Sequence, residues 1–413
     1  MAYSAREIEE AVIQGFREAH GTAPAVVAKA PARVELLGNH TDYNGGLVLA
    51  AAIDRYTAVA GKPSTGREGR VVSAGFGQET FPVDALEKGE PGSWGRYVRG
   101  VLWALSQTYE IRHGFKAAIV GEVPLGAGIS SSASLQASFA SFLISAGVVD
   151  DPSTVERTPI TAAHADERRL ALARILQRSE NEFVGVSSGL LDQFTVLFGR
   201  AEHALILDCQ TLAFERLPLG TRPPSIIVCD SKTSRRLAGG MYNQRHSECE
   251  TIVSFFRKGR GTEAVRWLRD ITLDDLTEFW DQLDPIGRLR ARHVLTENQR
   301  VAEGASALKR GNLAEFGRLM SASHRSSRDD FANSSPALDA LIASAEESPG
   351  FLGGKLSGAG WAGCTVNLVE ADKAPEFAET VSAGYHRRTG VVPDIHVCHA
   401  ANGARGTILS VAH

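Results

Sequence analysis

A glycine- and serine-rich segment carries the clearest chemical signal in this sequence. It runs from Pro124 to Ser134, between a strand-like and a helix-like run, and contains Gly126, Ala127, Gly128, Ser130, Ser131 and Ser132. Glycines allow positive φ and close approach to a ligand, and the free N–H groups of a helix's first turn attract anions. The segment lacks the Gly-Lys-Ser/Thr of a Walker loop and the third glycine of a dinucleotide fingerprint. It predicts a phosphate cradle, although a small-residue turn followed by a helix cap has the same composition.

Two further blocks extend this signal towards both ends of the chain. One runs from Ala30 to Gly46 and contains Arg33-Val34-Glu35-Leu36-Leu37-Gly38-Asn39-His40-Thr41-Asp42-Tyr43. The other runs from Gly353 to Val366 and is again rich in glycine. In this order and separation, the three blocks resemble the signature motifs of the GHMP small-molecule kinases. The His-Thr-Asp-Tyr core resembles the galactokinase branch in particular, and the resemblance runs from about Ala30 to about Gly403.

The resemblance implies both a fold and a reaction. The expected fold class is α+β, with a ribosomal protein S5-like N-terminal sugar- and ATP-binding domain over 1–210 and a ferredoxin-like C-terminal domain over 211–413. The active site is expected between the domains, and a return of the last strand to the N-terminal domain is left open. The expected reaction transfers the γ-phosphoryl group of ATP, with Mg²⁺, to the C1 hydroxyl of galactose.

Phosphoryl transfer to an alcohol needs a phosphate cradle, a metal ion, a proton acceptor and positive charge. By resemblance, Asp192 is the expected catalytic base and Arg33 its cationic partner, while Ser132 and Glu180 match the metal ligands. A guanidinium holds a partly buried carboxylate ionised and oriented. From the residues alone, Glu180 also fits a solvated helix position and Asp192 a partner of a helix dipole. Whether the base is essential stays open, because a loose transition state needs little early proton abstraction.

The sugar and adenine contacts also follow from the resemblance. His40 and Asp42 match ligands of sugar hydroxyls, Gly189 matches a backbone contact to the sugar, and Tyr242 matches a pocket tyrosine. The aromatic pair Trp94 and Tyr97 matches the lining of the adenine site, and packing in a helix core is an equal alternative for Tyr97.

Three departures from the family pattern lie in the first block, and one of them concerns the sugar. The family usually has Gly at the position of Ala32, Asn at the position of Glu35 and Glu at the position of Asn39, and the glutamate at this last position faces the C6 side of the sugar. An amide accepts a hydrogen bond without charge assistance and can also donate to an anion. Galacturonate, arabinose and N-acetylgalactosamine therefore stay open as substrates. A sugar and ATP sensor is the alternative to an enzyme, although the complete catalytic set favours a kinase. The His40 to Tyr43 block disfavours a homoserine or mevalonate kinase.

The elements that must position these residues are predicted from apolar periodicity. Helices are expected near the N-terminus and over 94–106, 160–178, 186–199 and much of 244–309. Strands are expected at 26–28, 48–60, 71–83, 115–120, 204–208 and 225–229 and ending at 368–369. We expect a loop around Arg33, a turn at 61–66 and a linker at 220–224.

Composition limits the class of protein. The 413 residues carry a net charge of −4, which gives no support for nucleic acid or an anionic membrane as a partner. The five cysteines are scattered without a CxxC pair, which fits a reducing cytoplasm rather than a disulfide framework or a zinc site. The N-terminus has an amphipathic pattern instead of a signal peptide, and Leu47 to Ile53 is too short to span a bilayer. A cytoplasmic protein is expected, monomeric with a dimer left open, whose partners are a sugar and ATP.

Overall fold

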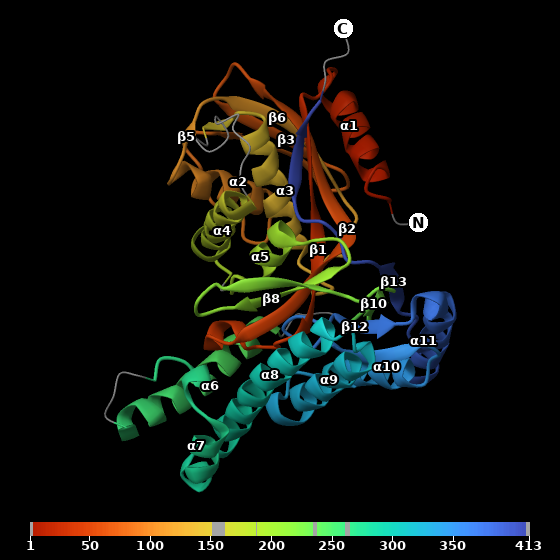
Figure 1. Ribbon diagram of the computed structural model, residues 1–413. Coiled ribbons are helices and arrows are strands. Elements are labelled where there is room, and N and C mark those ends of the chain that lie inside the picture. The colour runs from red at the N-terminus through yellow and green to blue at the C-terminus, as the bar shows by residue number, and fades with distance from the viewer. Residues whose placement is uncertain (1–2, 151–161, 187, 234–237, 261–264, 410–413) are drawn as a thin grey trace.

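Two β-sheets organise this computed structural model, which describes residues 3–150, 162–186, 188–233, 238–260 and 265–409. The first sheet has eight strands and occupies the upper part of Figure 1, with strand order β14-β1-β2-β6-β3-β4 and the hairpin β8-β9 joined to β2. Its strands are β1 Val26–Leu37, β2 Leu47–Ser64, β3 Glu68–Ser73, β4 Gly77–Pro82, β6 Gly114–Gly121, β8 His203–Asp208, β9 Phe214–Pro218 and β14 Arg405–Ile408.

Helices cover both faces of the first sheet (Figure 1). Alternate residues of β1 enter opposite cores, because successive side chains of a strand point to opposite faces. Val26 and Ala28 join the core under α3, whereas Val27 packs with Val12 and Phe16 of α1. The helices are α1 Glu7–His20, α2 Trp94–Ser106, α3 Ser131–Ser145, α4 Ala162–Arg178 and α5 Leu191–Phe198, and a two-stranded ribbon joins β5 Glu110–Ile111 to β7 Val149–Asp150.

The second sheet has four antiparallel strands in the order β11-β12-β10-β13. Its connections follow the β-α-β-β-α-β order of ferredoxin-like sheets. One face packs on α10 and α11, and the other faces α9 and the first sheet. The strands are β10 Ser225–Asp230, β11 Phe351–Leu356, β12 Cys364–Val369 and β13 Asp394–Cys398. The helices are α6 Ala238–Arg260, α7 Leu273–Glu278, α8 Pro285–Lys309, α9 Leu313–Ser326, α10 Pro336–Glu346 and α11 Ala374–Thr389.

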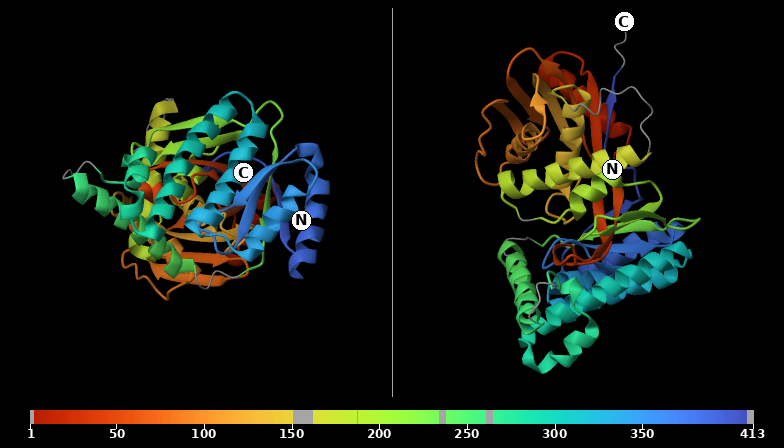
Figure 2. Two further views of the ribbon diagram at one scale, coloured as in Figure 1. Left: turned by 90° about the horizontal axis from the view of Figure 1, so that it is seen from below. Right: turned by 60° about the vertical axis from the view of Figure 1, so that its left-hand side comes forward.

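The C-terminal segment leaves the second sheet and returns to the first. In Figure 1 it runs upward beside β1 and ends near α1, and β14 pairs with β1 from Val26↔Ile408 to Lys29↔Arg405. The right-hand view in Figure 2 shows the two sheets with their helices as an upper and a lower part of the molecule. The predicted boundary at 210/211 falls in the connection between β8 and β9, which pair with each other in the first sheet. The division into two domains stays a prediction.

Most predicted elements are present, and three predicted boundaries were wrong. Arg33 lies within β1 instead of a loop, because β2 pairs with the backbone of β1 there. Strand β2 continues to Ser64 through the predicted turn, because its backbone pairs with β6 as far as Ser64. Helix α5 begins at Leu191 rather than 186. The sequence analysis missed strands β9, β11 and β13 and helices α9, α10 and α11. The start of the predicted helix at 160 lies outside the described residues. None of the helices in the described ranges is long and apolar enough to cross a membrane.

Candidate active site

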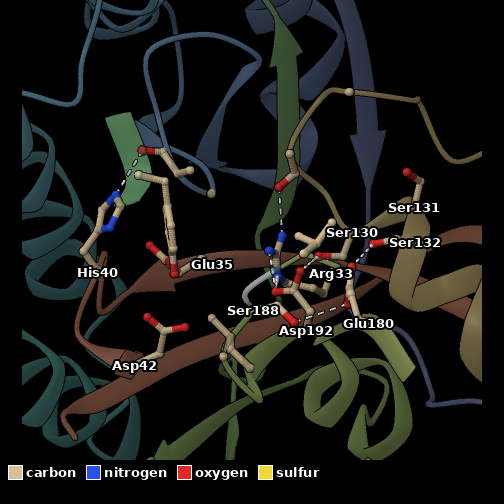
Figure 3. Close-up of a pocket in the computed structure, with 18 of the residues that line it drawn as sticks. Arg33, Glu35, His40, Asp42, Ser130, Ser131, Ser132, Glu180, Ser188 and Asp192 are labelled. Atoms are coloured by element: carbon tan, nitrogen blue, oxygen red, sulfur yellow. Dashed lines mark hydrogen bonds and ion pairs between the residues drawn. The ribbon is translucent and has the colours of Figure 1, made fainter. Parts of the chain in front are cut away.

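A cavity of about 670 Å³ lies where the three glycine-rich blocks meet. A volume of this size is typical of small-molecule sites. Fourteen of the predicted site residues line it: Arg33, Asn39, His40, Asp42, Tyr97, Gly126, Gly128, Ser130, Ser131, Ser132, Glu180, Gly189, Asp192 and Tyr242. Figure 3 shows Glu35, His40 and Asp42 together at one end, and Arg33, Ser130, Glu180 and Asp192 together at the other. The cavity therefore has two chemically different ends.

Two predicted residues lie elsewhere. Ala127 is 1% exposed and belongs to the core between the two sheets. Trp94 packs against the core of the first sheet, and its indole Nε1 donates to the carbonyl of Phe76 at 3.1 Å. Contact between Trp94 and an adenine ring stays a prediction.

The phosphate cradle is formed by the turn between β6 and α3. Gly126 and Gly128 have φ of 73° and 83°, which glycine adopts without steric cost. Ser130 also has a left-handed backbone, with φ of 61°, and α3 begins at the next residue. The first turn of this 15-residue helix presents free backbone N–H groups, and Ser131 and Ser132 line the cavity there. The turn and the free N–H groups at the start of α3 therefore form a site that can bind an anion.

The predicted pair of Arg33 and Asp192 is present in the structure. The Arg33 Nε and Nη2 atoms lie 2.7 and 2.5 Å from Asp192 Oδ1, and Nη1 donates to the carbonyl of Gly128 at 2.8 Å. The Ser130 hydroxyl donates to Asp192 Oδ2 at 2.5 Å. Arg33 is 6% exposed, so its guanidinium is held in one orientation with the carboxylate facing the cavity. This carboxylate is placed to accept a proton from a ligand beside the cradle.

Glu180 lies in a short π-helical segment, Ser179–Val184, directly opposite Ser132. The Ser132 hydroxyl donates to Glu180 Oε1 at 3.1 Å, and the amide of Gln193 donates to Oε2. Burial and the nearby charge of Asp192 raise the pKa of Glu180 from 4.5 to about 7. None of the described residues gives this buried carboxylate a cationic partner. A hydroxyl and a carboxylate are hard oxygen ligands, so the site fits a Mg²⁺ ion that neutralises Glu180.

The sugar end of the cavity is built around Asp42. Burial and the charge of Glu35 raise the pKa of Asp42 to about 7. A Cβ atom on Gly189 would lie 2.1 Å from Asp42 Oδ2, so only glycine allows the carboxylate this position. The ring of Tyr242 lies 5.5 Å from that of His40.

Both ring nitrogens of His40 are engaged by the protein. Burial lowers the pKa of His40 to about 3, so the ring is neutral. Because a carbonyl only accepts, Nε2 carries the proton and donates to the carbonyl of Ala359 at 3.0 Å. Nδ1 then accepts from the Tyr43 hydroxyl at 2.9 Å. A direct bond from His40 to a sugar hydroxyl stays a prediction.

The sequence analysis missed the residues that surround Asn39. Glu35 lines the cavity and forms a buried ion pair with Lys355 of β11, with Nζ and Oε1 2.6 Å apart. The cavity is also lined by Ser188, Asn243, Gly358 and Ala359. One signal was available for Glu35: it follows Arg33 by two residues, so in a strand both side chains point to the same face. No sequence signal indicated Lys355.

Comparisons with known proteins define the class first. Residues 96–200 match the family described as GHMP kinases N terminal domain, and residues 305–387 match GHMP kinases C terminal. Residues 14–63 match the Galactokinase galactose-binding signature. The chain is therefore a member of the GHMP kinases, and the predicted α+β fold of that family is confirmed.

Within that class the chain belongs to the galactokinase family. It is 40% identical over 391 residues to the galactokinase of Roseiflexus sp. (strain RS-1), and the aligned region covers 94% of each chain. It is 37% identical to the galactokinase of Chloroflexus aggregans (strain MD-66 / DSM 9485), over 95% of this chain and 96% of that one. The crystal structure of Lactococcus lactis galactokinase complexed with galactose has a TM-score of 0.86 and 32% identity, covering 97% of this chain and 99% of that chain. A mevalonate kinase structure, at 17% identity and a TM-score of 0.62, shares the fold. The resemblance inferred from the sequence is confirmed.

Proposed function

We propose that this chain catalyses the transfer of the γ-phosphoryl group of ATP to the C1 hydroxyl of galactose. Membership of the galactokinase family supports the reaction. The observation that carries the proposal is the contact of the Arg33–Asp192 pair with the phosphate cradle, since Arg33 binds the carbonyl of Gly128 and Asp192 binds Ser130. A proton acceptor thus lies beside the place where phosphates bind.

Each group at the cradle end has a defined task. The turn from Gly126 to Ser132 binds the phosphates through backbone N–H groups. The C1 oxygen of the sugar attacks the γ-phosphorus, the bond from that phosphorus to the bridging oxygen breaks, and ADP leaves. Asp192 accepts the proton of the C1 hydroxyl. Arg33 orients Asp192 through its hydrogen bonds, and its positive charge stabilises the negative charge of the transition state.

Ser132 and Glu180 are the residues that would hold Mg²⁺ in this site, together with phosphate oxygens. When bound there, the ion would supply positive charge that offsets the negative charge of the phosphates. Gln193 and Ser188 contact Glu180 and fix the direction of its carboxylate. A cytoplasmic location and a monomeric state stay predictions.

At the other end of the cavity, Asp42 is placed to bind sugar hydroxyls, with Gly189 and Tyr242 beside it. A substrate panel tests the proposal. Purified protein with ATP and Mg²⁺ is incubated with galactose, galacturonate, arabinose, N-acetylgalactosamine and glucose, and ADP release is followed. The phosphate position in the product is determined by NMR. We expect the highest kcat/KM for galactose and phosphate at C1. No ADP above background with galactose, and turnover of another sugar, would leave only the kinase class standing.

A further inference from the structure

The side chain of Asn39 has no hydrogen-bonding capacity left for a ligand. Its Nδ2 atom donates to Glu35 Oε1 at 3.1 Å and to the carbonyl of Gly358 at 2.8 Å. Its Oδ1 atom accepts from Ser327 at 3.3 Å and from Asn333 at 2.8 Å. An amide has two donor hydrogens and two acceptor lone pairs. All four are used inside the protein, and Asn39 is 1% exposed.

Glu35 has the opposite arrangement. Both hydrogen bonds to its carboxylate, from Asn39 and from Lys355, go to Oε1. Among the described residues, none donates a hydrogen bond to Oε2. Glu35 lines the cavity and is 5% exposed. The Oε2 atom keeps accessible surface in the cavity, so a ligand hydroxyl there can donate a hydrogen bond to it.

Lys355 is the ion-pair partner of this carboxylate. Its side chain is completely buried, and its ammonium contacts Glu35 Oε1 but does not line the cavity. The other buried carboxylate nearby, Glu297, is engaged by Arg300, Ser323 and the backbone of Gly38. Lys355 therefore positions Glu35, and Glu35 presents negative charge to the ligand.

We propose that Glu35, positioned by Lys355, is the residue of this chain that accepts a hydrogen bond from the C6 hydroxyl of the sugar. This inference rests on the proposed function, which sets the reacting C1 hydroxyl at Asp192 and so directs the other end of the sugar to Glu35, His40 and Asp42 (Figure 3). By the family resemblance, residue 39 lies on the C6 side of the sugar. Glu35 accepts a hydrogen bond from the side chain of Asn39, so its carboxylate lies on the same side. The structure thus supplies at residue 35 the carboxylate that is absent from residue 39.

The proposal has two consequences for substrate choice. A sugar with a C6 hydroxyl binds more tightly than the same sugar without it, because the hydroxyl donates to a charged acceptor. A sugar with a C6 carboxylate is rejected, because two anions would meet in a buried site. Galactose is therefore favoured over 6-deoxygalactose and over galacturonate by the same side chain.

The test compares binding of galactose, 6-deoxygalactose and galacturonate by calorimetry, with turnover measured in parallel. The variants are Glu35→Gln, which removes the charge at constant size, and Glu35→Gln/Lys355→Met, which also removes the lysine that the first variant leaves unpaired. The matched control is Glu215→Gln, the same change at an exposed residue outside the cavity. The double variant keeps the test valid if the single variant fails to fold.

In both variants we expect the preference for galactose over 6-deoxygalactose to fall by about fivefold to tenfold, the difference between a charged and a neutral acceptor. Affinity for galacturonate should rise, and the control should behave as the wild type. Unchanged preferences in both variants would overturn the assignment of Glu35. If the wild type binds galactose with this Glu35-dependent preference but does not phosphorylate it, the proposed reaction fails and the inference stands. Binding of none of the three sugars would overturn both.

Discussion

Replacing Asn39 by Glu tests the hydrogen-bond network at the sugar end of the cavity. The amide of Asn39 donates to Glu35 Oε1 at 3.1 Å, so Asn39→Glu sets a second carboxylate against the first. The change also removes the donor to the carbonyl of Gly358. Because the site is 1% exposed, water cannot replace these bonds.

Two estimates of the folding stability lost in Asn39→Glu agree. With an effective dielectric constant near 20, two like charges 4 Å apart repel by about 4 kcal/mol. The protein can avoid this repulsion by protonating one of the two carboxyl groups, which costs about 4 kcal/mol at pH 7 for a group of ordinary pKa. The free energy of protonation is therefore the upper limit of the loss in stability. Since proteins are stable by about 5–15 kcal/mol, Asn39→Glu should lower Tm by several degrees at pH 7.5. Near pH 5 protonation is cheap, and most of the loss should disappear.

Thermal unfolding at pH 7.5 and pH 5 is the assay. Asn39→Gln lengthens the side chain without charge and separates size from repulsion. The exchange Glu35→Asn/Asn39→Glu has one carboxylate and one amide again, so it should recover most of the stability lost in the single variant. Equal stability of Asn39→Glu and Asn39→Gln at pH 7.5 would refute the reasoning, because it would show that residues 35 and 39 do not share one buried site.

Three further predictions concern the two ends of the cavity. Asp192→Asn should lower kcat at least about a hundredfold with nucleotide binding little changed, and near wild-type turnover would remove the role of base. Gly189→Ala should lower kcat/KM for galactose on the order of a hundredfold, because its Cβ displaces Asp42, whereas Gly240→Ala meets open space and should be neutral. Burial raises the pKa of Asp42 from 3.8 to about 7. Its contribution to stability is therefore full below pH 3.8 and is lost as the pH rises through about 7. Asp42→Asn should flatten that part of the stability profile of the ligand-free protein, and an unchanged slope would show that Asp42 does not cause it.

The sequence predicted the cradle end of the cavity well, because its signals are local. The turn from Gly126 to Ser132 needs positive φ and a helix start, and both are encoded by neighbouring residue types. The contact of Arg33 with Asp192 joins residues 159 positions apart, but each lies in a motif that the family resemblance identified. Local chemistry and motif order were sufficient there.

The sugar end could not be predicted in the same way. Lys355 reaches Glu35 across 320 positions, and Asn333 reaches Asn39 across 294. No periodicity or spacing connects such residues, because the contacts arise only when the second sheet packs on β1. A loop was predicted around Arg33 for a related reason: polar residues interrupt the apolar pattern of β1, yet pairing with β2 and the buried ion pairs keep the strand extended to Leu37.

The pairing of β14 with β1 has a consequence for synthesis of the chain. Lys29 is synthesised 376 positions before its partner Arg405. At about 5–20 residues per second, the free edge of β1 waits on the order of tens of seconds for its partner. During that time its backbone N–H and C=O groups are open to pairing with other nascent chains, as at any exposed sheet edge. The residues from Val26 to Lys29 are therefore a place where a growing polypeptide of this sequence is exposed to misassembly, and pairing with β14 ends that exposure.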